Sequence, residues 1–385
     1  MTRKKLPCLG TETPWLKKAD EKKKRSLLSG PRILPKALTG RESVATLLET
    51  AFLAYNGRKL KEACLLFTEK MLQKDVTVGL SLTGALTPAG LGASCIVPLI
   101  RAGFVDWIVS TGANIYHDLH FAFDCPVYTG NHETDDTALR DNDIVRIYDL
   151  FLGYTDCLLE TDNIFQRIVE EPEFEGEMGT AEFHDHLGRH AAEKEGRRGR
   201  KNVSFLAAAH RAGVPVYSSS PGDSTIGMNI AMLELVGHKL RINPSIDVNE
   251  STALVLDGKR KGKTGVFILG GGSPKNFMLQ TEPHLQEILG IDDMGHDYFI
   301  QVTDARPDTG GLSGATPSEA VSWGKVNPGE LPNAVVAYLD STVALPIITH
   351  YALGKRKKRP LKRLVRRRGE MVAYLTEEFR RVQGV

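Results

Sequence analysis

The segment GGLSGATPSEAVSWGKV, residues 310–326, brings a carboxylate, an indole and an amine close together. Glu319 and Trp323 are four residues apart and would share one face of a helix, with Lys325 just beyond them. A lysine partly desolvated beside an aromatic ring has a lowered pKa and can act as a nucleophile that forms an imine. The Trp323 ring and the Glu319 carboxylate could hold a cationic amine. Lys325 alone is typical of a solvated surface lysine, but these neighbours favour imine chemistry on an amine substrate.

Two glycine-containing turns follow apolar runs and could approach a cofactor. GGGSPKNF at 270–277 has three glycines, which let backbone N–H groups come near a phosphate or a ribose. STGANIYHDLH at 110–120 offers Thr111 and Gly112 as positions for hydrogen bonds to a cofactor. Neither turn has the GxGxxG spacing, so each is also compatible with an ordinary tight turn between a strand and a helix.

Six short apolar runs between residues 75 and 345 are each followed by a loop rich in Gly, Ser, Thr or Asn. Continuous apolar strands separated by helices are typical of a parallel sheet covered on both faces, and such sheets bind ligands at the carboxyl ends of their strands. We therefore predict an α/β fold with a doubly wound, mostly parallel sheet and one composite site. The predicted strands are Val76–Leu82, Val105–Val109, Val214–Tyr217, Gly265–Leu269, Tyr298–Val302 and Ala334–Leu339.

Composition places the 385-residue chain among folded, soluble proteins, because 41% of its residues are apolar and 25% are charged. The net charge of +2 hides an asymmetry: residues 1–35 sum to +7 and residues 355–385 to +9, which leaves −14 for the rest. An acidic body favours cationic small molecules. Five cysteines without a CxxC spacing indicate neither a disulfide framework nor a zinc site, and no apolar run reaches the roughly 18 residues of a membrane span. We expect a cytoplasmic protein without a metal.

Charge patterning predicts three parts: an N-terminal basic arm over 1–40, an α/β domain over 41–354 and a basic amphipathic C-terminal helix over 355–385. The charged segment at about 173–201 is interpreted as a surface insertion with a mobile part, whose histidines are solvated rather than metal ligands. The run KRKKRPLKRLVRRR could bind nucleic acid, but it contains no aromatic residues for stacking. We expect the C-terminal helix to dock on the body or on another subunit instead.

From about residue 75 to 345 the chain resembles the deoxyhypusine synthase family, at SEAVSWGK, at LGGG with Lys275 and at the strand end with Asp340. The resemblance implies a Rossmann-like fold with helices on both faces of the sheet, and a homotetramer that binds NAD between subunits. It also implies a reaction: NAD oxidises spermidine, diaminopropane leaves, and the remaining butylimine passes through an active-site lysine to an acceptor amine. The acceptor is a protein lysine in deoxyhypusine synthases and putrescine in the related homospermidine synthases.

Roles follow from this resemblance position by position. Lys325 matches the lysine that forms the imine, and Trp323 and Glu319 match residues of the polyamine pocket. The positions that match or adjoin NAD contacts are Thr111, Gly112, Asp223, Gly271, Gly272, Asp340 and Ser341.

Several positions depart from the eukaryotic pattern of the family and remove acidic or hydrogen-bonding groups. A triamine carries about three positive charges, each of which needs a carboxylate or an aromatic partner when buried, so these losses predict a changed or shorter substrate. We expect Tyr116 and Asn276 to line the substrate pocket and His117 to serve as a general base. The pattern resembles the bacterial deoxyhypusine synthase-like branch, in which homospermidine or a related polyamine is an expected product. The departing positions are Tyr116, His117, Asn276, Met228, Leu312, Ala85 and Pro88.

A second hypothesis is a protein that binds NAD but has altered or lost catalysis and senses a metabolite. The missing acidic groups favour it, and the presence of Lys325 argues against it. Replacing Lys325 by Ala separates the two, because a sensor would keep its response to ligand and a transferase would lose turnover.

Overall fold

The computed structural model describes residues 20–384 and divides the chain into two units, Met1–Arg41 and Glu42–Val385. In the first unit, helix α1 (Glu21–Leu27) begins at Asp20, whose carboxylate accepts hydrogen bonds from the backbone N–H groups of Lys22 and Lys23. The predicted basic arm corresponds to this unit, with residues 1–19 outside the described part.

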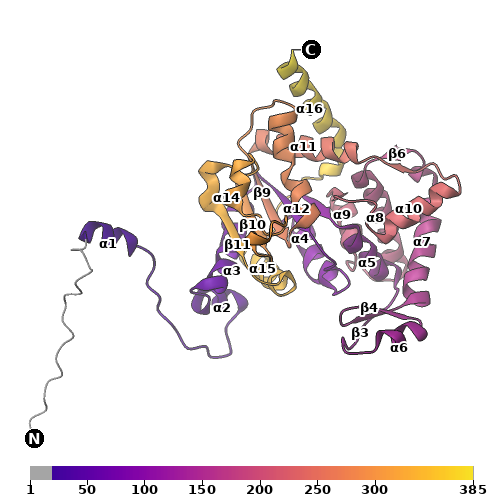
Figure 1. Ribbon diagram of the computed structural model, residues 1–385, viewed down its shortest axis with the longest axis horizontal. Helices are drawn as coiled ribbons and strands as arrows, with labels where there is room; N and C mark the ends of the chain where they lie inside the picture. Colours follow the sequence, from indigo (N-terminus) through magenta and orange to yellow (C-terminus); the bar gives the residue numbers. More distant parts are fainter. Residues whose placement is uncertain (1–19, 385) are drawn as a thin grey trace, which may run out of the picture. The chain divides into compact units, whose positions relative to one another are not determined.

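The second unit is organised by one sheet of six parallel strands in the order β11-β10-β9-β1-β2-β7. The α/β prediction is confirmed, and each of the six apolar runs supplies one strand. The chain builds outward from β1 through β2 to β7, returns to the other side of β1 at β9, and continues to β11 (Figure 1). The strands are β1 (Val76–Leu82), β2 (Trp107–Ser110), β7 (Val216–Ser218), β9 (Lys263–Leu269), β10 (Tyr298–Val302) and β11 (Ala334–Ala337).

Both faces of this sheet are buried, as the unbroken apolar character of the strands predicts. On β9, Phe267 and Leu269 belong to one hydrophobic core, whereas Val266 and Ile268 belong to the other. The first core takes side chains from α3 (Tyr55–Leu65), α4 (Val97–Arg101), α5 (Gly112–Phe123), α9 (Phe205–Ala212) and α15 (Ser341–Lys355). The second takes them from α11 (Pro244–Lys261), α12 (Gly272–Leu279), α14 (Pro317–Ser322) and α16 (Arg368–Gln383).

The remaining elements extend this framework. A three-stranded antiparallel sheet, in the order β3-β5-β4, lies beside α6 and away from the central sheet (Figure 1). These elements are α2 (Val44–Ala51), β3 (Val127–Thr129), α6 (Asp136–Asp141), β4 (Ile144–Ile147), β5 (Leu150–Gly153), α7 (Glu160–Val169), β6 (Glu177–Met178), α8 (Thr180–Arg197), α10 (Thr225–Leu235), β8 (Arg241–Ile242) and α13 (Thr281–Pro283), with shorter helical turns η1 (Leu66–Met71), η2 (Gly92–Ile96), η3 (Tyr154–Leu159), η4 (Pro172–Phe174), η5 (His284–Ile288), η6 (Pro307–Thr309), η7 (Pro328–Asn333) and η8 (Leu364–Arg367). Within residues 20–384 no helix is both long enough and apolar enough to cross a membrane.

The prediction of a partly mobile surface insertion at 173–201 is wrong over most of its length. This segment forms α8, which buries Phe183, Leu187 and Ala191 in the first core. Asp247 of α11 caps its first turn by accepting hydrogen bonds from Thr180. Most of the charges that suggested exposure lie on the outer side of this helix, but Glu195 is buried and accepts a hydrogen bond from Arg211. His184, expected to be solvated, is buried and its Nδ1 lies 2.8 Å from the carbonyl oxygen of Val216.

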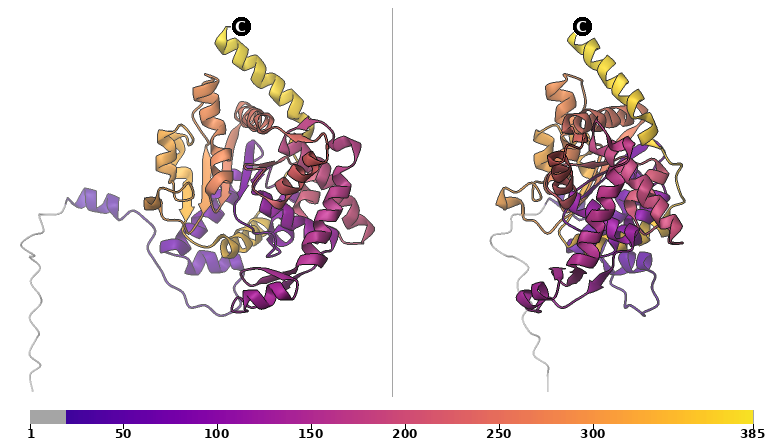
Figure 2. Two further views of the ribbon diagram at one scale, coloured as in Figure 1. Left: turned by 45° about the vertical axis from the view of Figure 1, so that its right-hand side comes forward. Right: turned by 90° about the vertical axis from the view of Figure 1, so that its right-hand side faces the viewer.

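The prediction of one amphipathic helix over 355–385 is also wrong in its first third. The chain is extended from Arg356 to Arg363, and the C-terminal helix α16 begins only at Arg368, from where it projects outward (Figure 2). The reason is that Arg359 is almost fully buried: its guanidinium donates to Asp106 Oδ2 at 3.0 Å and to several backbone carbonyls. A helix through this stretch would point those donors away from their acceptors.

Candidate functional site

The carboxyl ends of the central strands meet where the strand order reverses, between β1 and β9. There Thr83, after β1, exchanges hydrogen bonds with the backbone of Gly271, after β9. The N–H of Gly272 donates to Ser313 Oγ at 2.9 Å. A Cβ on Gly271 would lie 2.3 Å from the Cα of Ser313, so glycine is required for this close approach. In open α/β sheets this reversal point is where ligands bind.

The residues expected to contact NAD lie along this edge, although not at one point. Thr111 and Gly112 begin α5 after β2, and Gly271 and Gly272 begin α12 after β9. Asp223 precedes α10, and within residues 20–384 its exposed carboxylate has no hydrogen bond or ion pair. Asp340 and Ser341 follow β11 at the far side of the sheet, where Asp340 caps α15 by accepting from the N–H of Thr342 at 2.6 Å.

This edge has the donor set that a dinucleotide needs. Helices α5, α12 and α15 begin at this edge, and the positive ends of their dipoles suit phosphate oxygens. The unengaged carboxylate of Asp223 suits ribose hydroxyl groups. Thr111 is already engaged, because its hydroxyl donates to the carbonyl of Gly84 at 2.7 Å. The residues present therefore fit a dinucleotide, with Thr111 shaping the turn.

Lys325 is directed into the sheet's carboxyl edge by the end of α14. Thr316 caps this helix and Pro317 occupies its first turn. The helix ends at Trp323, after which Gly324 adopts a positive φ of 67° that reverses the chain. The backbone of Lys325 is then fixed at both groups, since its N–H donates to the carbonyl of Ala320 at 3.0 Å and its carbonyl accepts from the N–H of His296 at 3.1 Å.

We name the cavity around this side chain the lysine hollow. It has a volume of about 280 Å³. Lys325 Nζ donates to Asn276 Oδ1 at 3.1 Å and lies 5.5 Å from the centroid of the Trp323 ring. Trp323 is 57% exposed, which leaves ring surface for a ligand. The structure thus brings four predicted site residues together. The hollow is lined by Lys275, Asn276, Leu279, Gln280, Leu312, Ala315, Glu319, Ala320, Trp323 and Lys325.

Electrostatics favour a reactive amine in this hollow. Desolvation by burial lowers the pKa of Lys325, against smaller opposing effects from the carboxylates of Glu319 and Glu287. The balance remains below the ordinary lysine value. A larger fraction of Lys325 is therefore the neutral amine, which is the nucleophilic form.

Lys275 is a second lysine of the hollow, and its role was not predicted from the sequence. It is 3% exposed, and its Nζ donates to Gln301 Oε1 at 3.0 Å and to the carbonyl of Ala315 at 2.6 Å. Its pKa is lowered to about 8, chiefly by burial, with a smaller raising effect from Glu319 and a smaller lowering effect from the charge of Lys325. The position of Lys275 shortly after the three glycines was visible in the sequence, but its burial depends on β10.

The structure of one chain does not bring Tyr116 and His117 into the lysine hollow. Both lie on α5, which packs against α7. Tyr116 donates its hydroxyl to Asp162 Oδ1 at 2.9 Å, and His117 Nδ1 lies 3.0 Å from His120 Nε2. Burial lowers the pKa of His117 to about 4, so it holds a proton less readily than an ordinary histidine. The role of His117 as a general base stays a prediction that a single chain does not complete.

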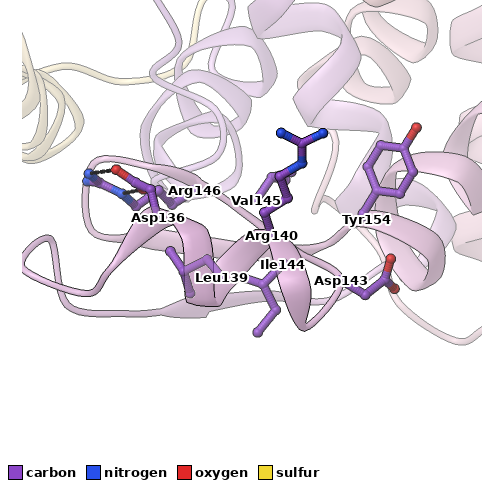
Figure 3. Close-up of a pocket in the computed structure, with 8 residues that line it drawn as sticks. All are labelled: Asp136, Leu139, Arg140, Asp143, Ile144, Val145, Arg146 and Tyr154. Atoms are coloured by element: carbon purple, nitrogen blue, oxygen red, sulfur yellow. Dashed lines mark hydrogen bonds and ion pairs between the residues drawn. The ribbon is translucent and has the colours of Figure 1, made fainter.

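A larger hollow of about 620 Å³ lies beside the antiparallel sheet (Figure 3). Its polar groups include the Arg146–Asp136 ion pair and Arg140, which has no ion pair within residues 20–384. Among residues 20–384, no lysine or histidine lines this larger hollow. The reactive lysine therefore lies in the smaller of these two cavities. The described part of the chain also contains no group of three or more His, Cys, Asp or Glu suited to a metal.

Known proteins resemble this chain in sequence and in fold. The deoxyhypusine synthase family model matches residues 46–352. A "Deoxyhypusine synthase-like protein" of Thermosynechococcus vestitus is 51% identical over 376 residues, covering 97% of this chain and 92% of its own length. "Probable deoxyhypusine synthase 2" of Methanosarcina mazei is 40% identical, covering 77% of this chain and 82% of its own length. A crystal structure assigned as a deoxyhypusine synthase of Entamoeba histolytica shares the fold, with a TM-score of 0.52 and 13% identity over 86% of this chain and all of that one.

Proposed function

Because the chain belongs to the deoxyhypusine synthase family, we propose that it is an NAD-dependent transferase that moves the aminobutyl group of spermidine to an acceptor amine through an imine on Lys325. The observation that carries this proposal is the half-buried Lys325 amine, held by Asn276 beside the Trp323 ring at the carboxyl edge of the sheet. A free diamine such as putrescine, giving homospermidine, is the acceptor that we propose over a protein lysine.

The lysine hollow supplies groups for each end of a polyamine. Trp323 offers a ring face to an ammonium group, and Glu319 offers a carboxylate. Leu279 and Ala315 provide apolar wall for the methylene chain. Attack of the Lys325 amine on the oxidised carbon releases diaminopropane and leaves the butyl chain on the enzyme.

A dinucleotide would lie at the adjoining strand ends, close to the backbone at Gly112 and Gly271 and to the Asp223 carboxylate. NAD would there take up a hydride from the donor amine and return it at the end of the cycle, so that no external oxidant is consumed. Asp340 and Ser341 begin α15 on the far side of the same edge.

The family resemblance also supports an assembly in which the site is shared between subunits. Met228 is 63% exposed on α10, next to the strand end that carries Asp223, and such an apolar surface suits a second copy of the chain. We propose a homotetramer. Sedimentation and activity, measured on the same sample, test this proposal. A fully active monomer would contradict it.

The experiment that tests the function traps the imine. The protein is incubated with NAD and spermidine, reduced with borohydride and digested, and the Lys325 peptide is analysed by mass spectrometry. An aminobutyl adduct on Lys325 with release of diaminopropane supports the proposal. An NAD-binding protein that forms no adduct and releases no amine would be the sensor instead.

A further inference from the structure

A second cavity lies next to the lysine hollow, and the proposed reaction as described so far does not use it. We name it the α13 hollow; its volume is about 290 Å³. Gln280 lines both hollows, so the two lie on either side of this side chain. The residues of the α13 hollow are Val248, Ser251, Thr252, Phe277, Gln280, Thr281, Pro283, His284, Glu287 and Ile288.

The η5 turn lines this hollow and also contacts the chain next to Lys325. Gln286 donates from Nε2 to the carbonyl of Gly324 at 2.9 Å, next to Lys325 in the chain. Glu287 follows in the same turn and faces the hollow. The Glu287 carboxylate is near enough to Lys325 to oppose the lowering of its pKa. Because Glu287 adjoins Gln286, a ligand bound at Glu287 would lie beside the contact that holds the chain just before Lys325.

The α13 hollow has the chemistry of a diamine site. Glu287 is exposed, and within residues 20–384 its carboxylate has no ion pair or hydrogen bond. The one histidine of the hollow, His284, bonds through Nδ1 to Thr252 Oγ1 at 2.8 Å, and burial lowers its pKa, so it does not compete as a cation. Phe277 and Ile288 add apolar wall for methylene groups. A free carboxylate beside apolar surface suits a short chain that carries an ammonium at its end.

We propose that the α13 hollow binds the acceptor, a small aliphatic diamine, with its far ammonium on Glu287 and its other nitrogen directed at the imine on Lys325. This inference rests on the proposed function. The acceptor nitrogen attacks the imine carbon and forms the new C–N bond. The bond from that carbon to Lys325 Nζ then breaks, and a proton passes from the acceptor nitrogen to Nζ. The exchange of imines is redox-neutral, and Lys325 is released as the amine.

The test separates the two halves of the reaction in the full chain. Glu287→Gln removes the charge and keeps the shape, and Glu377→Gln is the matched control, since Glu377 is an exposed carboxylate of α16 without an ion pair in the described residues. We expect Glu287→Gln to raise the KM for putrescine about tenfold, which corresponds to about 1.4 kcal/mol. Trapping of the aminobutyl group on Lys325 from spermidine should stay within about twofold, and Glu287→Asp should restore part of the loss.

Calorimetry with putrescine on a Lys325→Ala protein measures binding without turnover. Adding Glu287→Gln to this protein should weaken putrescine binding about tenfold, which matches the expected change in KM. Normal trapping with an unchanged putrescine KM in Glu287→Gln would overturn the acceptor site alone. Normal trapping in a wild type that does not use putrescine would overturn it as well and favour a protein lysine as acceptor. A wild type that forms no adduct would overturn the proposed function, and the inference with it.

Discussion

The lysine hollow and the histidine pair on α5 both hold residues that the sequence nominated for catalysis, but they differ in what surrounds them. Lys325 has one side-chain hydrogen bond, to Asn276, and faces a cavity. His117 is bonded to His120, which in turn lies 2.8 Å from Thr161 Oγ1 of α7. A series of hydrogen-bonded side chains that ends inside the protein holds helices together. A series that ends at a cavity leaves a polar group available for chemistry. Substitutions at Lys325 should therefore affect catalysis, whereas substitutions at His117 should affect stability.

Lys325→Ala should abolish the borohydride adduct and lower the rate of diaminopropane release on the order of a thousandfold or more, because the nucleophile is gone. Lys325→Arg should do nearly the same, since a guanidinium stays protonated. Mass spectrometry of the products measures the effect. Thermal unfolding is the control, and both variants should melt close to the wild type.

Lys275→Met should lower the free energy of unfolding by about 1–3 kcal/mol, because Gln301 and the carbonyl of Ala315 each lose a buried donor. Denaturant unfolding measures this. The trapping rate should fall as well, since Gln301 also holds the turns at Gly270 and Ser313 that shape the hollow. A Lys275→Met protein with wild-type stability would show that these bonds add nothing to the fold.

His117→Gln should lower the free energy of unfolding by about 1 kcal/mol, through the lost contact with His120. Trapping on Lys325 should stay within about twofold. A hundredfold loss of trapping in a normally folded protein would instead show that a second subunit brings His117 to the lysine hollow, and the contrast drawn above would fail.

A pH titration should separate the two regions by the pH window in which stability changes, because both pKa values are lowered and both contributions rise with pH. The pKa of His117 is about 4 in the folded protein, below the ordinary 6.5, so the unfolded chain binds more protons as the pH falls from about 6.5 to 4. This histidine therefore contributes stability above pH 6.5 that is lost across that window. Lys275, with a pKa of about 8, makes the folded state more stable as the pH rises from about 8 towards 10.5. Unfolding curves of His117→Gln and Lys275→Met against pH should each lose the corresponding slope.

The sheet was predictable because its signal is local. Each strand is a short apolar run, and the predicted ranges of β1 and β10 match the structure residue for residue. The mistakes came from charged segments. Density of charge was taken for exposure in α8, and an amphipathic pattern was taken for a continuous helix before α16. Asp247 and Asp106, distant in sequence, decide how those segments fold. Partners so far away leave no local pattern.

The same distinction holds for the site. Glu319, Trp323 and Lys325 are neighbours in sequence, so their cluster could be read directly. Asn276 reaches Lys325 from another strand end, and this pairing was foreseen only as a substrate-pocket position. The burial of Lys275 depends on β10, and the free carboxylate of Glu287 depends on the packing of α13 and η5. Neither feature can be predicted from the spacing of residues in the sequence.

The extended stretch around Arg359 also bears on how the protein is made. Arg359 supplies donors to the carbonyl of Gly103, to backbone oxygens just before and at the start of β1, and to Asp106, which itself accepts from the N–H of Val78. The amino ends of β1 and β2 are therefore tied to a residue that lies 253 positions beyond Asp106 in the chain. A chain cut just after α15 keeps a buried carboxylate without its cation, so we expect that chain to be degraded rather than merely shorter.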